Sequence, residues 1–128
     1  MKTHRNNWVA ASCFMTMLMF SAQGAFADAA AGKVIYEGTG GCVACHGMSG
    51  QGDGPAGMAL NPKPRSFVEG AYLYDTDGDG QPGSDTDLLN IIKNGSAKYG
   101  GAPTMPGRAD IPDADIQAIV AYLRSLKK

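Results

Sequence analysis

The sequence has few aromatic side chains from which to build a hydrophobic core. Its 128 residues include one tryptophan, four phenylalanines and five tyrosines. Trp8 and three of the four phenylalanines precede residue 28, so Phe67 is the sole phenylalanine of residues 28–128. Small domains bury a low fraction of their surface, and residues 28–128, with 17 glycines and 7 prolines, approach the composition of disordered sequences. A large apolar cofactor acting as the core would resolve this conflict.

Cysteine and histidine are also scarce, with three and two residues respectively. Cys13 and His4 lie near the N-terminus, which leaves Cys42, Cys45 and His46 for the rest of the chain. A structural zinc site needs four ligands, so these residues cannot form one. No run of lysine or arginine indicates nucleic-acid binding.

The N-terminal residues have the pattern of a secretory signal peptide. Lys2, His4 and Arg5 give a basic start, residues 9–20 are almost wholly apolar, and residues 25–27 form a small-x-small cleavage site. We therefore expect cleavage after Ala27, a single mature domain over residues 28–128 and a periplasmic location.

The apolar run of that signal is too short to span a bilayer, which takes roughly 20 residues. Lipid attachment at Cys13 is disfavoured because the apolar run continues past that residue. We expect no membrane span in the mature chain.

Residues 42–46, Cys-Val-Ala-Cys-His, match the pattern for covalent attachment of a c-type haem. On a helical turn, side chains three and four residues apart lie on one face. Cys42 and Cys45 can therefore form thioethers while His46 offers a nitrogen to the iron. A thioredoxin-like dithiol is the alternative, but it needs a βαβ context, and the neighbouring sequence is glycine-rich and helical.

The loop after the motif should hold the ligating histidine. A ligating imidazole needs an acceptor for its other ring nitrogen, and we expect the carbonyl of Pro55 to be that acceptor, stiffened by the fixed φ of proline. Arg65, and less strongly Lys63, could meet the haem propionates, because arginine has a planar fork suited to carboxylates. The alternative is that both are solvated charges.

A haem iron held by His46 has a second axial position, and residues 28–128 contain no further histidine to fill it. Met48 is tethered to the same haem face as His46, and Met58 follows the loop assigned to that face. Met105 stands between two prolines, 59 residues after His46, with enough chain to reach the opposite face. We predict His46 and Met105 as the ligands, with an open iron or Lys98 as the alternative.

An acidic stretch resembles the start of a calcium loop. Asp75, Asp77 and Asp79 occupy positions one, three and five, and Gly80 occupies position six. Position twelve is Thr86 and not the expected glutamate. The sequence allows a Ca²⁺ site, but an acidic surface loop fits the same pattern.

Hydrophobic periodicity and capping signals predict helices. We expect helices over residues 29–38, 84–94 and 113–126, and a single helical turn at 56–60. Ser84 is the expected N-cap of the second, with Asp87 three residues later and Gly95 as its end. Ile116, Ile119, Val120 and Leu123 form an apolar stripe on the last.

Taken together, the chain resembles the class I cytochrome c family over residues 29–126. The resemblance is carried by Cys42, Cys45 and His46, by Gly54-Pro55, by Met105-Pro106 and by Ala121-Tyr122-Leu123. It implies an all-α cytochrome c fold, with three to five short helices around one covalently attached haem. It also implies that the first and last helices cross at Gly32, Tyr36 and Tyr122.

Two departures from that family pattern matter. No tryptophan remains to serve the propionates, which leaves Arg65, Tyr72, Tyr74 and Tyr99 as candidates for that contact. The acidic insert at residues 75–87 is longer than the minimal pattern.

The resemblance implies a soluble monohaem electron carrier and not an enzyme, since no residue is assigned as acid, base or nucleophile. Removing Lys2 and Arg5 changes the formal charge from −1 to −3, which favours a basic redox partner. We expect transient partners and a monomer. The alternatives are a haem subunit of a larger oxidoreductase, and a haem peroxidase or ligand sensor with an open sixth site.

Overall fold

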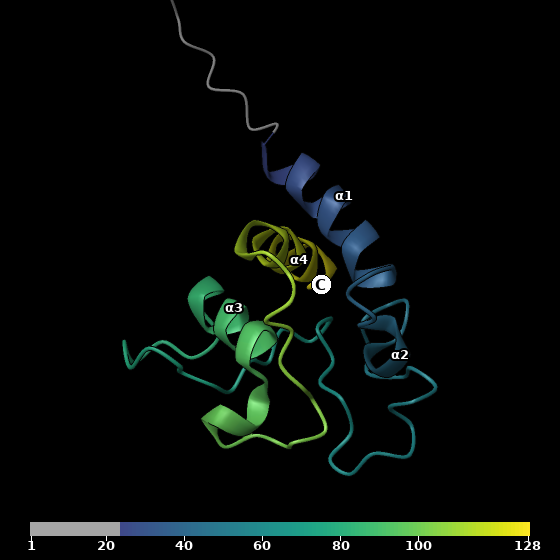
Figure 1. Ribbon diagram of the computed structural model, residues 1–128, viewed down its shortest axis with the longest axis vertical. Helices are drawn as coiled ribbons and strands as arrows, with labels where there is room; N and C mark the ends of the chain where they lie inside the picture. Colours follow the sequence, from purple (N-terminus) through teal and green to yellow (C-terminus); the bar gives the residue numbers. More distant parts are fainter. Residues whose placement is uncertain (1–23) are drawn as a thin grey trace, which may run out of the picture.

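The computed structural model describes residues 24–128, with side chains from residue 28, and this part of the chain is all-α (Figure 1). Its helical elements are α1 (Gly24–Glu37), α2 (Val43–His46), α3 (Asp85–Asn94), the 3-10 helix η1 (Ser96–Tyr99) and α4 (Asp113–Leu126). Within residues 24–128, β-pairing is limited to one bridge between Gly95 and Pro106. The predicted fold class is confirmed.

The N-terminal helix begins earlier than expected. α1 starts at Gly24 and not near residue 29, so the expected cleavage site after Ala27 falls within it. Most of the predicted signal peptide lies outside the described residues, and its removal stays a prediction. Within residues 24–128 no helix combines the length and the apolar character needed to cross a bilayer.

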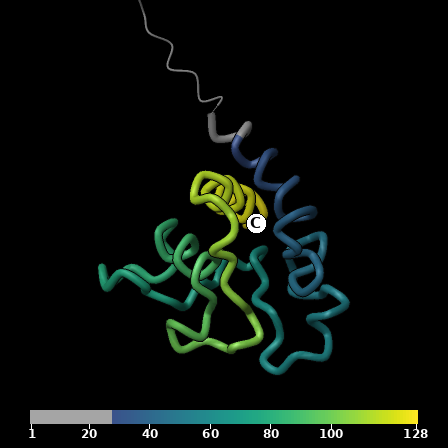
Figure 2. Tube along the Cα trace, viewed as in Figure 1, coloured from purple at the N-terminus to yellow at the C-terminus, as the bar shows by residue number. Residues whose placement is uncertain are grey.

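α1 and α4 pack against each other where they cross (Figures 1 and 2). Gly32 makes the crossing possible, because a Cβ at this position would collide with the backbone carbonyl of Ala118. Four residues further along α1, the ring of Tyr36 meets that of Tyr122 edge-on, with centroids 5.2 Å apart. The predicted meeting of these residues at the helix crossing is confirmed.

This close approach predicts a large effect for a small substitution. Gly32→Ala should lower the free energy of unfolding by about 2 kcal/mol or more, because the added methyl group must push two helix backbones apart. Chemical denaturation of the haem-loaded protein measures it. Lys33→Ala is the matched control on the same helix: it removes only an exposed pair with Glu37 at 3.8 Å, which is worth under about 0.5 kcal/mol. An equal loss in both variants would contradict the role given to Gly32.

α3 is closed at both ends as its sequence predicts. The Ser84 side chain accepts a hydrogen bond from the Asp87 N–H, and the Asp87 carboxylate accepts one from the Ser84 N–H, which completes a capping box. Gly95 ends the helix with φ of 82°, a conformation that favours glycine.

α4 also follows its prediction, beginning directly after Pro112. Its apolar stripe is buried, and with α1 and α3 it forms the core. The core residues are Tyr36, Phe67, Leu88, Ile92, Ile111, Ile116, Ile119, Val120, Tyr122 and Leu123. Lys93 of α3 bridges to Asp113 of α4 at 2.6 Å.

The helical turn predicted at residues 56–60 does not become a helix. Gly57 and Met58 both donate their N–H groups to the Gly54 carbonyl, at 2.8 and 3.1 Å, and form tight turns. The chain cannot continue in the α conformation, because Asn61 precedes a proline and is biased away from it.

Candidate haem site

A cleft of about 340 Å³ opens between the Cys-x-x-Cys-His turn, α3, α4 and the loop that carries Met105. Its walls are mainly apolar and come from segments distant in sequence. They include Leu60, Phe67, Leu88, Ile91, Ile92, Ile119 and Leu123. Cys42, Cys45, His46, Arg65 and Met105 line the same cleft, so the structure brings most of the predicted site residues together.

α2 orients the histidine. The His46 N–H donates to the Cys42 carbonyl at 2.9 Å, which closes one helical turn and directs Cys42, Cys45 and His46 to the cleft. His46 is buried, and its Nδ1 lies 3.1 Å from the Arg65 carbonyl oxygen. A carbonyl can only accept, so Nδ1 carries the proton and Nε2 keeps a lone pair for a metal.

Burial lowers the pKa of His46, and the hydrogen bond to the Arg65 carbonyl opposes this only in part. The ring is therefore neutral at neutral pH, which is the form that ligates iron.

The prediction that Pro55 accepts this hydrogen bond is wrong. Pro55 is exposed and does not line the cleft. Gly54 donates to the Cys45 carbonyl at 3.1 Å and Ala56 donates to the Ala44 carbonyl at 2.8 Å, and these bonds hold Pro55 against the outside of α2. The segment that runs through Arg65 passes behind the imidazole instead and supplies the acceptor.

Phe67 is a site residue that the sequence did not reveal. Its ring stacks on His46 with centroids 4.5 Å apart and an interplanar angle of 26°. Its N–H donates to the Gly50 carbonyl at 2.7 Å, which ties it to the loop after the motif. Tyr36 lies edge-on to Phe67 at 6.5 Å and donates its hydroxyl to the Gly47 carbonyl at 2.8 Å. The imidazole plane is thus fixed by a ring stack as well as by a hydrogen bond.

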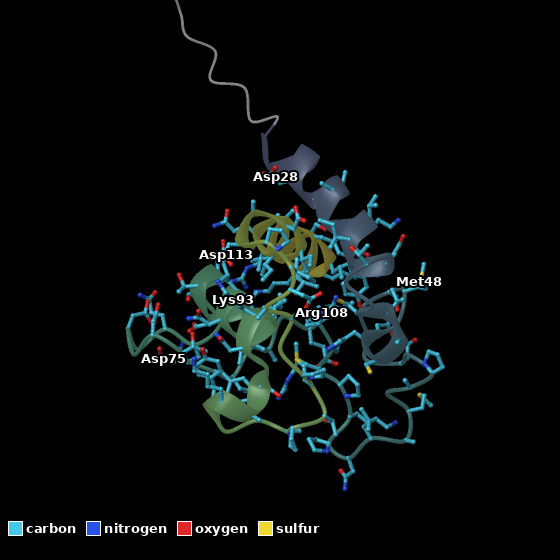
Figure 3. All side chains as sticks on the ribbon, viewed as in Figure 1. Asp28, Met48, Asp75, Lys93, Arg108 and Asp113 are labelled. Atoms are coloured by element: carbon cyan, nitrogen blue, oxygen red, sulfur yellow. The ribbon has the colours of Figure 1, made fainter. Side chains whose placement is uncertain are left out.

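Met105 is the methionine that reaches the cleft. It is half-buried, and its carbonyl accepts from the Ser96 N–H at 3.3 Å. Met48 and Met58 are 64% and 56% exposed and do not line the cleft, and neither does Lys98. Figure 3 shows Met48 at the outer edge of the molecule. Among the three methionines of residues 28–128, Met105 is therefore the one that lines the cleft, and its role as a ligand stays a prediction.

Cys42 and Cys45 are not joined by a disulfide, and both are half-buried at the cleft. Burial raises the pKa of Cys42 above its ordinary value, although the Arg108 guanidinium opposes the shift. A thioredoxin-like dithiol needs a βαβ context, and β-pairing within residues 24–128 is limited to one bridge. Two thiols, an imidazole and a thioether around an apolar cleft are the donor set that fits a covalently bound haem.

The sequence of residues 29–127 matches the cytochrome c family. The chain belongs to the cytochrome c family. Among solved structures it is similar to a chain of the reducing HAO-like protein complex of Kuenenia stuttgartiensis, with 29% sequence identity and a TM-score of 0.63. That match covers 80% of this chain and 44% of the other, so the cytochrome spans less than half of that chain's length. No curated protein sequence is significantly similar to it.

The fold of the cytochrome places some of the residues predicted to contact the haem propionates at the cleft and one of them away from it. Arg65, Lys63, Tyr72 and Tyr74 line the cleft, whereas Tyr99 does not. The hydroxyl of Tyr99 instead accepts from the Asn94 side chain at 3.0 Å. Arg65 thus lines the cleft, and its carbonyl accepts from His46, while a contact of its side chain with the propionates stays a prediction.

The acidic loop brings together a different set of carboxylates from the one predicted. Asp75, Asp77 and Asp87 place oxygens within 4.8 Å of one another, and Asp79 is not among them. Asp75 accepts backbone N–H bonds from Gly78 at 2.7 Å and Gly80 at 2.9 Å. Figure 3 shows Asp75 at the far edge of the molecule, beyond α3. Calcium binding stays a prediction of the sequence, to be tested by the effect of a chelator on the melting temperature.

Asp87 is buried but fully hydrogen-bonded. One carboxylate oxygen accepts from the N–H and hydroxyl of Thr76, at 2.5 and 2.8 Å, and the other from the N–H and hydroxyl of Ser84, at 2.8 and 2.9 Å. Burial disfavours the charged form, but these bonds outweigh it and hold the pKa of Asp87 at about 2, below its ordinary value of 3.8. The charged carboxylate joins the acidic loop to α3.

This lowered pKa predicts a pH-dependent stability. The folded state favours ionised Asp87, so the stabilisation is complete above about pH 4 and is lost as the pH falls toward about 2. Asp87→Asn should cost about 2 kcal/mol at neutral pH and flatten the dependence of the melting temperature on pH between about 4 and 2. Asp79→Asn is the control, because exposed Asp79 accepts only from the Gln81 N–H. Parallel pH profiles for wild type and Asp87→Asn would contradict the prediction.

Proposed function

We propose that this cytochrome carries single electrons between redox proteins. Haem c would be held by thioethers to Cys42 and Cys45, with His46 and Met105 as axial ligands. The observation that carries the proposal is the convergence of these four side chains on one apolar cleft. When bound, the haem supplies an iron that gains or loses one electron, and a histidine with a methionine raises its reduction potential.

The residues of the cleft support a carrier rather than an enzyme. Asp87 lines it, but its two oxygens already accept four hydrogen bonds and are not available as a base. His46 would be occupied by the iron. If His46 and Met105 both held the iron, no position on it would remain for a substrate.

Partners and location follow from the same proposal. We infer export to the periplasm after removal of residues 1–27, one haem per chain, and a monomer that meets its partners transiently. Leu73 is 58% exposed and lines the cleft, so an apolar contact near the haem edge is available to a partner. The negative formal charge of residues 28–128 supports a basic partner, with association rates that fall as salt rises.

A second candidate function is that of a haem subunit within a larger oxidoreductase. The structural neighbour supports it, because that chain belongs to a protein complex and only 44% of its length is covered by the match. Purification of the protein from its native source, followed by size-exclusion chromatography with light scattering, separates the two. A monomeric mass favours the free carrier, and a stable partner in the same peak favours the subunit.

The spin state of the iron tests the proposed function directly. The ferric protein should be low-spin and show the weak far-red sulfur-to-iron band, and the reduced protein should bind carbon monoxide only slowly, because the methionine must first leave the iron. A high-spin ferric spectrum with ready carbon monoxide binding would indicate an open sixth site, and would favour a peroxidase or ligand sensor.

A further inference from the structure

Arg108 lies at the cleft between two parts of the chain that are far apart in sequence. Its Nη2 donates to the Thr39 carbonyl at 2.9 Å, and its Nη1 donates to the Gly40 carbonyl. Its Nε donates to Asp110 at 2.9 Å. Arg108 is half-buried and lines the cleft, and Figure 3 shows it near the centre of the molecule.

The two carbonyls belong to a different segment of the chain from Met105. Thr39 and Gly40 lie three and two residues before Cys42. Gly40 lines the cleft and is fixed to the end of α1 by its N–H bond to the Ile35 carbonyl at 2.7 Å. Met105 is only three residues before Arg108. The guanidinium therefore joins the wall that carries the cysteines to the loop that carries the methionine.

The other hydrogen bonds that attach the methionine loop to the rest of the protein run to α3 and η1. Ser96 donates to the Met105 carbonyl at 3.3 Å, the Ser96 hydroxyl donates to the Ala102 carbonyl at 2.6 Å, and the Arg108 N–H donates to the Ile92 carbonyl at 2.8 Å. All of these partners belong to α3 or η1. Without its side-chain bonds, the loop would keep its attachment to α3 and lose its attachment to the motif.

We propose that Arg108 is a positioning residue for Met105: it clasps the methionine loop to residues 39 and 40, and so keeps the methionine sulfur on the iron. The inference rests on the proposed function, because it takes Met105 as the axial ligand. Its physical basis is the geometry of guanidinium, which can donate to two carbonyls and a carboxylate at once. A lysine at this position could not make all of these bonds.

If Arg108 holds the methionine loop in this way, removing its hydrogen bonds should let Met105 leave the iron more often. Arg108→Gln should increase the limiting rate of carbon monoxide binding to the reduced protein by about tenfold, because it removes the charge-assisted hydrogen bonds to the Thr39 and Gly40 carbonyls at a half-exposed site. The far-red band of the ferric protein should also disappear at a lower temperature, before the helices unfold. Arg108→Lys should give a smaller increase, and Asp110→Asn, which keeps the carbonyl bonds, should stay close to wild type.

Arg124→Gln is the matched control. The Arg124 guanidinium also donates to a backbone carbonyl, that of Gly83 at 2.5 Å, and pairs with a carboxylate, that of Asp85 at 2.8 Å. It joins α4 to the acidic insert and not to the methionine loop. Arg124→Gln should lower the unfolding midpoint as much as Arg108→Gln and leave the carbon monoxide rate unchanged.

The outcomes separate this inference from the proposed function. A wild-type protein without the sulfur-to-iron band would overturn the proposed function, and this inference with it. A wild-type protein with the band, together with an Arg108→Gln variant whose rate is unchanged or is matched by Arg124→Gln, would overturn the clasp alone.

Discussion

Replacing Met105 by alanine should turn the ferric protein from low-spin to high-spin, abolish the far-red sulfur-to-iron band and allow carbon monoxide to bind the reduced form rapidly. Alanine has no donor atom, and residues 28–128 contain no second histidine to replace the sulfur. The reduction potential should fall, because methionine opposite histidine raises it. Optical spectra in both oxidation states and a potentiometric titration measure these changes.

The two exposed methionines provide the controls for this experiment. Met48→Ala and Met58→Ala remove the same thioether from side chains that are 64% and 56% exposed and lie outside the cleft. Both variants should retain the wild-type spectrum and potential. Persistence of the band in Met105→Ala, or its loss in Met58→Ala, would place a different ligand on the iron.

Preventing haem attachment should have the largest effect on the fold itself. A Cys42→Ser, Cys45→Ser double variant has no thiol for either thioether, and we expect it to lose the haem and with it cooperative unfolding. Without the haem, the apolar side chains that line the cleft would face water, and a small domain that already buries a low fraction of its surface would lose this burial.

Circular dichroism with thermal melting tests this expectation. The double variant should show reduced helix content and no sharp transition, and Cys42→Ser alone, with one thioether possible, should be intermediate. A colourless double variant that melts cooperatively near the wild-type temperature would show that the polypeptide forms its own core. The inference from the scarcity of aromatic residues, that a cofactor must act as the core, would then be wrong.

The parts of the fold that depend on local chemistry were predictable from the sequence. Ser84 and Asp87 are three residues apart, and Gly95 follows the last helical residue. Each end of α3 is therefore determined by residues that are close together in the sequence. The apolar stripe of α4 and the Cys-x-x-Cys-His turn are local in the same sense. Gly32 and Tyr36 are distant in sequence from Tyr122, and their meeting at the helix crossing was predicted only from the resemblance to a known family.

Two of the details that sequence reasoning missed involve backbone carbonyls. Every residue has a carbonyl, so no side-chain pattern could show that His46 pairs with Arg65, 19 residues away, and not with Pro55. For the same reason nothing marked Arg108 as the partner of Gly40, which is 68 residues away. Phe67 carried a weak signal as the sole phenylalanine of residues 28–128, but its stack on His46 depends on the path of the intervening chain.

A redox titration of the purified protein, followed by its optical spectrum, tests the central claim most directly. We expect one reversible wave that fits the transfer of a single electron, with the sulfur-to-iron band present in the oxidised form and lost as the wave proceeds. A colourless protein, or a red one whose oxidised form lacks that band and whose reduced form takes up carbon monoxide rapidly, would contradict the account.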